Sequence, residues 1–496
     1  MRAIRFSTFL ILAAFALLVF LAHLPYFGLP YFWDELGQFV PAALDILHDG
    51  AWIPHSTVPN AHPPGVMAYL ALVWRIAGYS IAATRWAMLA LAAAAVAVTY
   101  FLTGALSRDR APSILAVVFL LLDPLFYTQS MMAQLDMPAM LFTVLGLLLF
   151  LTDRHCAAAA ACTALVLSKE TGALLPLIFM VVLYRDPARS KYAAYYLAPF
   201  AALALWFLAL WHATGHLFGD PGFTQYNTIY SLHPVRASVA LLRRFFYLFV
   251  ADFRWVGALA ILFAWKRSSV FSTRGWKIVW CFIAGHILLV SLLGGATLER
   301  YLLPVIPLVY IAMGAAFQLL RPRWRYAGVV ALAAGLVAGL FVNPPFPFPY
   351  ENNLALVDFV DLHRNAARFI EKSYPGKTVY TAWPLTQALH DPEFGYVDHA
   401  MSATETSDLH VSTLSALNPE SVDVLVLYSR TWEPSWGVLR WPALRDFLSR
   451  FYEYEREMNP AEVRQHFGLV PVQRWTRRGQ WIEIFARPVT DLSRGR

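Results

Sequence analysis

The stretch FSTFLILAAFALLVFLAHL, residues 6–24, is apolar over a length that would cross a bilayer, since a spanning helix needs about 20 such residues. It is followed within a few residues by YFWDELGQF, residues 31–39. Two adjacent carboxylates, Asp34 and Glu35, therefore stand where the chain leaves the hydrocarbon, and ionisable groups there usually mark function. The apolar run is too long for an ordinary signal peptide, so we expect an uncleaved first helix.

The composition indicates a polytopic membrane protein. Of the 496 residues, 58% are hydrophobic and only 14% are charged, whereas soluble domains carry roughly 25% charged residues. The net charge of +7 is distributed in short basic clusters between apolar runs. That distribution orients membrane helices and does not require a nucleic-acid partner. The three cysteines, Cys156, Cys162 and Cys281, lie in or beside apolar runs without metal-ligand spacing, so we expect them to be small hydrophobic residues embedded in the membrane.

Eleven apolar runs have about the length of a helix. They cover 7–24, 85–106, 112–128, 137–152, 156–168, 172–185, 192–212, 245–265, 276–295, 302–320 and 326–342. With the N-terminus in the cytoplasm, basic residues fall at every inner turn, as the positive-inside rule requires. A further run, 63–79, contains Arg75, and we expect it to lie along the outer interface instead of crossing. The first outer loop, 25–84, then contains two helical segments, 35–48 and 64–78.

The last apolar run is followed by a proline-rich linker, NPPFPFPYENN, residues 343–353. The sequence therefore predicts a transmembrane domain, 1–343, and a polar domain, 344–496, which by parity lies on the periplasmic side of a bacterial inner membrane. In the polar domain, strand-like runs (KTVYTAW, VDVLVLYS, QWIEIFA) alternate with helical runs at 356–374 and 441–458. This alternation indicates a small α/β domain with a parallel or mixed sheet.

Ionisable residues gather at four points of the predicted outer face. They are Asp34, Glu35 and His62 in the first loop, Asp136 in the second, Lys169 and Glu170 in the turn between spans five and six, and Glu299, Arg300 and Tyr301 at the start of span ten. Acids beside bases at a membrane surface suit a reaction between a hydroxyl and a phosphate-linked lipid. A carboxylate accepts the hydroxyl proton, and cations or a metal stabilise the departing phosphate.

Each of these groups also has a purely structural interpretation. Two acids at a helix start are favoured by the helix dipole, and an acid before Met-Pro can cap a helix. A neighbouring lysine and glutamate can form a simple ion pair, and an arginine near a helix end can extend its charge to the interface. Their shared face is what favours a common functional site.

The order of these motifs resembles a family. A WDE after the first span, a His-Pro-Pro helix start, an L-D-x-P, an S-K-E-T-G turn and an R-Y-x-L-P-x-x-P segment follow one another over residues 1–320. Together they resemble the GT-C glycosyltransferases of the protein O-mannosyltransferase and lipid A aminoarabinose transferase type, including galacturonosyltransferase-like members. The resemblance implies a polyprenyl-phosphate-linked sugar donor and an inverting transfer to an acceptor of the cell envelope, at the outer face among membrane lipids.

The resemblance also implies roles for particular residues. Asp34 matches the catalytic aspartate of the first loop and is expected to act as general base, with Glu35 beside it and Asp136 as the acidic residue of the second loop. The donor phosphate is expected to meet four side chains: His62, Lys169, Arg300 and Tyr301. His62 stands where the family often has lysine. No dedicated metal cage is present, but Asp34 and Asp136 could share a divalent ion, as hard cations prefer oxygen ligands.

Two other functions are compatible with a polytopic chain. A transporter or flippase of lipid-linked sugars would carry polar residues near the membrane midplane in broken helices, often with internal repeats, and we find no repeat. A non-catalytic scaffold of a polysaccharide assembly complex would leave Asp34 dispensable. The sequence favours the transferase. The sugar, the acceptor, metal dependence, the role of the C-terminal domain and the oligomeric state stay open.

Overall fold

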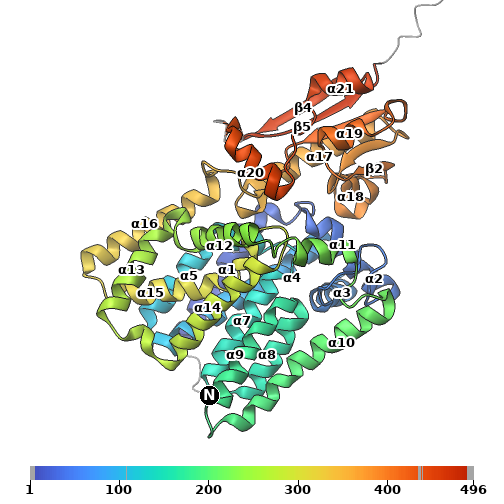
Figure 1. Cartoon of the computed structure of the whole chain (residues 1–496). Helices are drawn as coiled ribbons and strands as arrows, with labels where there is room; N and C mark the ends of the chain where they lie inside the picture. The colour runs from blue at the N-terminus through green and yellow to red at the C-terminus, as the bar shows by residue number, and fades with distance from the viewer. Residues whose placement is uncertain (1–5, 108, 434–436, 438–439, 489–496) are drawn as a thin grey trace, which may run out of the picture. The chain divides into compact units, whose positions relative to one another are not determined.

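The computed structural model describes residues 6–107, 109–433, 437 and 440–488. The chain divides into two compact units (Figure 1). The first unit comprises Met1–Phe27 and Gln38–Val342, and the second comprises Gly28–Gly37 and Asn343–Arg496. The short segment that contains Asp34 and Glu35 therefore belongs to the same unit as the C-terminal region.

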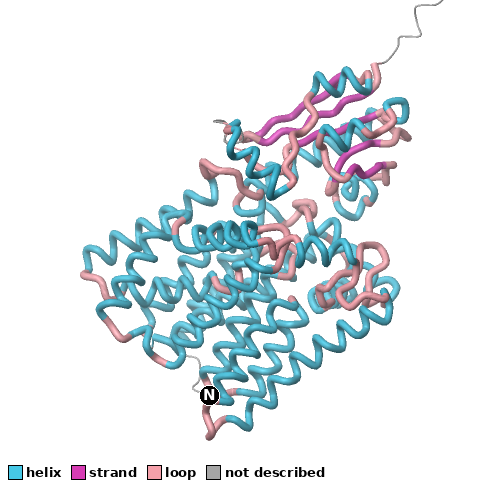
Figure 2. Tube along the Cα trace, in the orientation of Figure 1, coloured by secondary structure: helices cyan, strands magenta, loops and turns pink. Residues whose placement is uncertain are grey.

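The first unit is built of helices (Figure 2). They are α1 (Phe6–His23), α2 (Val40–Asp49), α3 (Gly65–Ala77), α4 (Ile81–Ser107), α5 (Arg110–Leu122), α6 (Pro124–Gln129), α7 (Asp136–Leu151), α8 (His155–Ser168), α9 (Leu174–Tyr184), α10 (Leu197–Thr214), α11 (Pro221–Thr224), α12 (Pro234–Phe249), α13 (Arg254–Arg267), α14 (Arg274–Leu292), α15 (Ile306–Phe317) and α16 (Pro322–Phe341). Each of the eleven predicted apolar runs contains one or two of these helices. The two helical segments expected in the first loop correspond to α2 and α3.

Five helical stretches of the described chain are long and apolar enough to cross a membrane, and a bent pair makes a sixth. The five are Thr8–Tyr26, Ile81–Ser107, Ser190–Thr214, Arg274–Leu292 and Pro322–Phe341. The remaining predicted spans correspond to apolar helices of 10–17 residues. These lengths support a membrane location, and the number of eleven spans stays a prediction.

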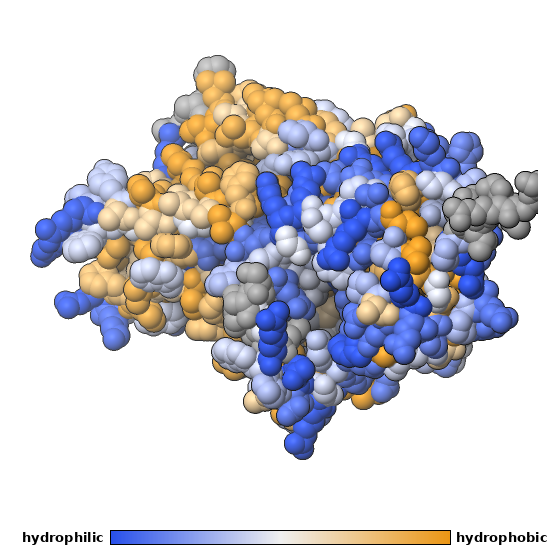
Figure 3. Space-filling view, turned by 90° about the horizontal axis from the view of Figure 1, so that it is seen from above, coloured by the Kyte–Doolittle hydropathy of each residue, from blue (hydrophilic) through white to orange (hydrophobic). Residues whose placement is uncertain are grey.

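Exposed apolar side chains mark the same location. Among the described residues, the exposed large hydrophobic side chains lie in the first unit, apart from Phe346 and Trp441 in the second. Hydrophobic and hydrophilic side chains gather in separate regions of the surface (Figure 3). An apolar surface this extensive on the first unit is what contact with lipid requires, since soluble monomers rarely expose large contiguous apolar patches.

The predicted span over 245–265 is not one continuous helix. The structure has two helices here, α12 and α13, joined by a bend of 48°. Asp252 and Phe253 at the bend have positive φ angles, 50° and 62°, which a helix interior does not tolerate. The break lets the next residue, Arg254, turn into the protein and form ion pairs there.

The buried charges at this bend form what we call the Arg254 cluster: Asp123, Asp252, Arg254 and Tyr310. Arg254 donates to Asp123 through Nη2 at 2.6 Å and to Asp252 through Nη1 at 2.8 Å. Tyr310 donates its hydroxyl hydrogen to Asp123, and Nε of Arg254 donates to the same hydroxyl oxygen at 3.0 Å. Asp123 is also the N-cap of α6, since its side chain accepts from the backbone N–H of Phe126. The cluster therefore ties α6, the α12–α13 bend and α15 together.

The second unit contains a five-stranded sheet with the order β2-β1-β3-β5-β4. The strands are β1 (Val379–Ala382), β2 (Ala403–Thr406), β3 (Val424–Tyr428), β4 (Val470–Arg477) and β5 (Gln480–Ala486), and the helices are α17 (Ala355–Ser373), α18 (Leu385–His390), α19 (Val411–Ser415), α20 (Pro442–Tyr452) and α21 (Pro460–Phe467). β1 pairs in parallel with β2 and β3, whereas β5 is antiparallel to β3 and β4.

This sheet decides between the parallel and mixed alternatives in favour of the mixed one. The three predicted strands are present as β1, β3 and β5. The sequence missed β2 and β4 because both are edge strands with mainly polar or exposed residues. The helix expected over 441–458 ends earlier, at Tyr452, because Glu453 adopts a left-handed conformation with φ 54°.

Candidate functional site

Three regions that are far apart in the sequence meet at one buried carboxylate in the first unit. Oδ1 of Asp136, the first residue of α7, accepts a hydrogen bond from Nζ of Lys169 at 2.6 Å. Its Oδ2 lies 3.5 Å from Nε of Arg300. The Lys169 ammonium also lies 4.1 Å from the centre of the Tyr301 ring, within the range of a cation–π contact. We call these four residues the Asp136 cluster.

Local chain geometry holds Lys169 in place. The residue has an extended backbone between α8 and a short 3-10 turn, Glu170–Ala173. A Cβ at Gly172 would lie 2.5 Å from Cγ of Leu165, so the turn can fold back on α8 only with glycine at this position. The S-K-E-T-G motif is therefore a turn that places a lysine at the end of a helix, beside the first residue of α7.

A second pair of arginines supports the other side of the cluster, and the sequence analysis did not include them in the site. Arg244 of α12 donates to the carbonyl oxygens of Leu298 and Val290, at 3.0 and 2.7 Å, and its guanidinium lies 5.4 Å from the centre of the Tyr301 ring. Arg243 pairs with Glu299. Two adjacent arginines in a predicted outer loop, against the positive-inside pattern, were the available signal.

His286 contacts the same segment from α14. Its Nε2 lies 2.8 Å from the carbonyl oxygen of Tyr301, and its side chain is buried. The sequence analysis passed over it because a single histidine in an apolar run carries little information by itself. Together with Arg244, it fixes the backbone from which Arg300 and Tyr301 extend.

His62 lies beside the Asp136 cluster. Its Nδ1 is 2.9 Å from Oε2 of Glu170, and its ring contacts those of Phe39 and Phe223. Burial alone would raise the pKa of Glu170, but the facing charges of His62 and Lys169 and the hydrogen bond from His62 lower that pKa below its ordinary value. The ionised Glu170, which follows Lys169 in the chain, therefore connects His62 to the turn that holds Lys169.

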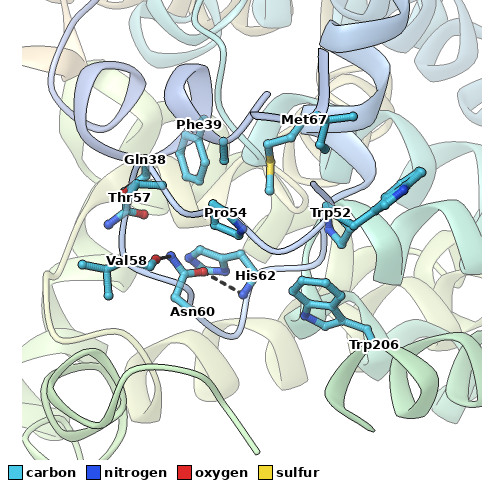
Figure 4. A pocket seen from close by; sticks show the side chains of 13 residues that line it. Gln38, Phe39, Trp52, Pro54, Thr57, Val58, Asn60, His62, Met67 and Trp206 are labelled. Atoms are coloured by element: carbon cyan, nitrogen blue, oxygen red, sulfur yellow. Dashed lines mark hydrogen bonds between the residues drawn. The ribbon is translucent and has the colours of Figure 1, made fainter. Parts of the chain in front are cut away.

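A small pocket opens on the other side of His62 (Figure 4). The residues that line it come from the turn before α2, from α2, the loop after it, α3 and α10: Gln38, Phe39, Ala42, Ile46, Trp52, Pro54, Thr57, Val58, Asn60, His62, Pro64, Met67 and Trp206. The loop between α2 and α3 is held by the side chain of Asn60, which accepts a hydrogen bond from the backbone N–H of His62 at 2.9 Å. Nε1 of Trp206 donates to the carbonyl oxygen of Ala61 at 3.1 Å. The pocket is thus a feature of the first unit.

Asp34 and Glu35 belong to the second unit. Glu35 is fully buried and accepts a hydrogen bond from the backbone N–H of Phe32 at 2.8 Å, whereas Asp34 is partly exposed. The preceding Trp33 has a φ of 47°, a strained conformation for a bulky residue that is often found at functional sites. Its ring packs against Phe359 and Trp383. The convergence of Asp34 on the Asp136 cluster stays a prediction.

The residues at Asp136 do not fit a divalent ion. One carboxylate oxygen already faces an ammonium and the other a guanidinium, and a metal bound there would lie against two positive charges. A different group, Asp45, Asp49 and His55, has ligand atoms close enough together for a metal. Asp45 is already satisfied in the protein, since it accepts from the backbone of His55 and from Ser56. We derive no step through a metal.

Solved structures resemble the chain over nearly its whole length. ArnT from Cupriavidus metallidurans bound to undecaprenyl phosphate is 13% identical, with a TM-score of 0.54 over 97% of this chain and 98% of that one. The oligosaccharyltransferase AglB from Archaeoglobus fulgidus, in complex with an inhibitory peptide and a dolichol-phosphate, is 11% identical, with a TM-score of 0.53 over 85% and 69%. No family model and no curated protein matches the sequence. Both structures are GT-C glycosyltransferases, and the predicted GT-C fold is confirmed.

Proposed function

We propose that this chain transfers a sugar from a polyprenyl-phosphate-linked donor to a hydroxyl of a cell-envelope acceptor at the outer face of a bacterial inner membrane. The Asp136 cluster is the observation that carries the proposal. It brings two buried cations, Lys169 and Arg300, together around the carboxylate of Asp136, and two converging cations suit a phosphate. The solved structures of the same fold contain undecaprenyl phosphate or dolichol-phosphate, which supports the same ligand class here.

In the proposed reaction, the acceptor oxygen attacks the anomeric carbon from the face opposite the phosphate. The new C–O bond forms as the bond between the anomeric carbon and the phosphate oxygen breaks, and the configuration inverts. The leaving polyprenyl phosphate takes the bonding electron pair. The acceptor proton passes to the carboxylate of Asp34, which acts as general base.

The cations have the complementary role. Lys169 and Arg300 stabilise the negative charge that develops on the leaving phosphate, and the ring of Tyr301 orients Lys169. Asp136 holds both cations in place before the donor binds, so in this mechanism it is a positioning residue. Glu35, which is buried and bonded to its own turn, supports the backbone next to Asp34.

A direct assay tests the proposal. The purified full chain is reconstituted in liposomes and incubated with polyprenyl-phosphate-linked sugars and a lipid fraction of the cell envelope, and radiolabel is followed from donor to acceptor. Transfer of the radiolabelled sugar to the acceptor supports the proposed enzyme. Movement of the donor between leaflets without transfer would identify a flippase. If neither activity is found, the scaffold interpretation is favoured.

The proposed orientation has its own test. In a variant whose native cysteines are replaced, Ser415→Cys on the exposed surface of the second unit should react with a membrane-impermeant thiol reagent in cells with a permeable outer envelope. The matched variant Ser269→Cys, in an exposed loop between α13 and α14, should react only after the inner membrane is lysed. The reverse pattern would place the second unit in the cytoplasm and contradict the proposal.

A further inference from the structure

The pocket beside His62, which we call the Trp52 pocket, is lined by aromatic and uncharged polar side chains. Polar groups from Gln38, Thr57 and Asn60 lie on one side of it, and the indoles of Trp52 and Trp206 lie on the other (Figure 4). The enclosed volume is small, about 20 Å³, which is enough for a hydroxyl-sized group, so the rest of a ligand would lie outside it. Trp52 is 58% exposed, so its indole can extend the binding surface beyond the pocket.

This combination fits one class of ligand. A pyranose has an apolar face of C–H bonds that packs on an aromatic ring, and an edge of hydroxyl groups that forms hydrogen bonds with amides and hydroxyls. Ligand sites typically combine apolar walls with a few convergent polar groups. A purely apolar ligand would pair with the indoles but not with the amide of Gln38, which burial beneath such a ligand would leave without a hydrogen bond at an energetic cost.

The charge of the lining indicates which sugars fit. Of the thirteen residues that line the Trp52 pocket, none is Asp, Glu, Lys or Arg. His62 is the single titratable one, and its Nδ1 is already engaged by Glu170 at 2.9 Å. An amino sugar would find no carboxylate in the lining, and a uronic acid would find neither lysine nor arginine. Burying either charge without a partner is costly.

The position of the pocket connects it with the proposed reaction. His62 lines the pocket and contacts Glu170, whose neighbour Lys169 binds Asp136. The pocket and the proposed phosphate site are thus separated by this short chain of side chains within one unit. A sugar in the pocket would lie next to the site at which we expect the lipid phosphate.

We propose that the Trp52 pocket binds the hydroxyl edge of an uncharged pyranose, with the face of the sugar on Trp52. The proposal rests on the proposed function, because a glycosyl transferase is what gives a sugar site its use. The sugar is that of the donor or of the acceptor. In either case the pocket selects for neutral sugars against amino sugars and uronic acids.

Saturation-transfer NMR on the full chain in nanodiscs tests this inference with free methyl glycosides. The probes are methyl α-mannopyranoside and methyl α-glucopyranoside as neutral sugars, methyl α-galactopyranosiduronate as the anion, and methyl 4-amino-4-deoxyarabinopyranoside as the cation. We expect a signal from at least one neutral probe that exceeds the signal from both charged probes by fivefold or more. Trp52→Leu and Gln38→Leu should each lower it at least fivefold.

Trp211→Leu is the matched control, because Trp211 of α10 is 56% exposed, is not among the residues that line the pocket and should leave the signal unchanged. A stronger signal from a charged probe, or an equal signal in Trp52→Leu and Trp211→Leu, overturns the inference. The thermal midpoint of each variant shows that the protein is folded, and because Gln38→Leu and Trp52→Leu are independent, one misfolded variant leaves the other to decide.

Transfer kinetics separate the two possible sources of the sugar and separate this inference from the proposed function. A Trp52→Leu variant with a raised KM for the lipid-linked donor assigns the pocket to the donor sugar, and a raised KM for the acceptor assigns it to the acceptor. Efficient transfer of a charged sugar, unaffected by Trp52→Leu, overturns the assignment of the Trp52 pocket but agrees with the proposed transferase function. Binding of neutral glycosides without any transfer supports the pocket assignment but contradicts the proposed transferase function.

Discussion

The first unit contains two buried groups of charges that differ in their balance. In the Arg254 cluster one guanidinium lies between two carboxylates, Asp123 and Asp252, and its ion pairs join the α12–α13 bend to the start of α6. In the Asp136 cluster one carboxylate lies between two cations. Burial is similar for most of these side chains, with exposures of 0–1% for Asp123 and Arg254 and 4–8% for Asp136, Lys169 and Arg300, whereas Asp252 is 23% exposed. The convergence of two cations, more than burial, therefore distinguishes a candidate anion site from a group of ion pairs that only joins helices.

The largest expected effect is the loss of stability when the Arg254 cluster is disrupted. Arg254→Ala leaves the buried Asp123 and the partly exposed Asp252 without their cation, and losing one partner of a buried pair costs about 3–5 kcal/mol. We expect a strong fall in the thermal midpoint of the purified protein in detergent. Arg267→Ala, an exposed arginine on the same helix, is the control and should change the midpoint little. Equal midpoints for the two variants would show that the Arg254 cluster does not stabilise the fold.

The next prediction concerns a loss of transfer rate with no loss of stability. Asp34→Asn keeps the shape of the side chain but cannot accept the acceptor proton, so the transfer rate should fall roughly 100-fold or more. Donor binding and the thermal midpoint should be retained. Asp398→Asn, at an exposed aspartate of the same unit, should retain full transfer. Near-normal transfer by Asp34→Asn would remove the general base from the mechanism.

Arg300→Ala tests whether the Asp136 cluster binds a phosphate. If Arg300 contacts the phosphate, removing it weakens the ground state and the transition state together. We expect donor affinity and kcat each to fall by about tenfold, with a smaller loss of stability than in Arg254→Ala because Lys169 still pairs with Asp136. A variant that loses stability but keeps its donor affinity would make the Asp136 cluster a second group of ion pairs that only joins helices.

The smallest effect concerns a partly buried acid of the second unit, Glu457, which lies near another acid. In the second unit, burial and the neighbouring Glu433 raise the pKa of Glu457 to about 7, although Arg430 partly offsets them. The unfolded chain releases this proton near pH 4.5, so the folded state retains a proton that the unfolded state has lost. Stability from this group is therefore full below about pH 4.5 and is lost as the pH rises towards 7.

Replacing the acid should remove this pH dependence. Glu457→Gln is expected to stabilise the protein at pH 8 by about 1 kcal/mol, less than the full pKa shift implies because the partly exposed side chain is screened by solvent, and to have little effect at pH 4.5, as measured by thermal unfolding of the full chain. Glu420→Gln, at an exposed glutamate of the same unit, is the control. A stabilisation of the same size at both pH values would contradict the proton linkage.

The sequence by itself determined the class of the molecule and most of its elements. Apolar runs such as 85–106 and 276–295 predicted helices because a bilayer requires long, uncharged segments whose backbone bonds are satisfied internally. The strands at 424–428 and 480–486 were predicted because continuous β-branched and aromatic residues favour a buried strand. The order of short motifs predicted the GT-C fold only through its resemblance to a known family.

Only the tertiary structure decided which charges meet. Asp123 and Arg254 are 131 positions apart, and no local pattern shows that they pair or that the pairing breaks a helix at Asp252. The same applies to Arg244 and His286, whose partners are backbone carbonyl oxygens on other segments. Hydrophobic periodicity is a property of neighbours along the chain, whereas an ion pair depends on distance in space, which packing alone determines.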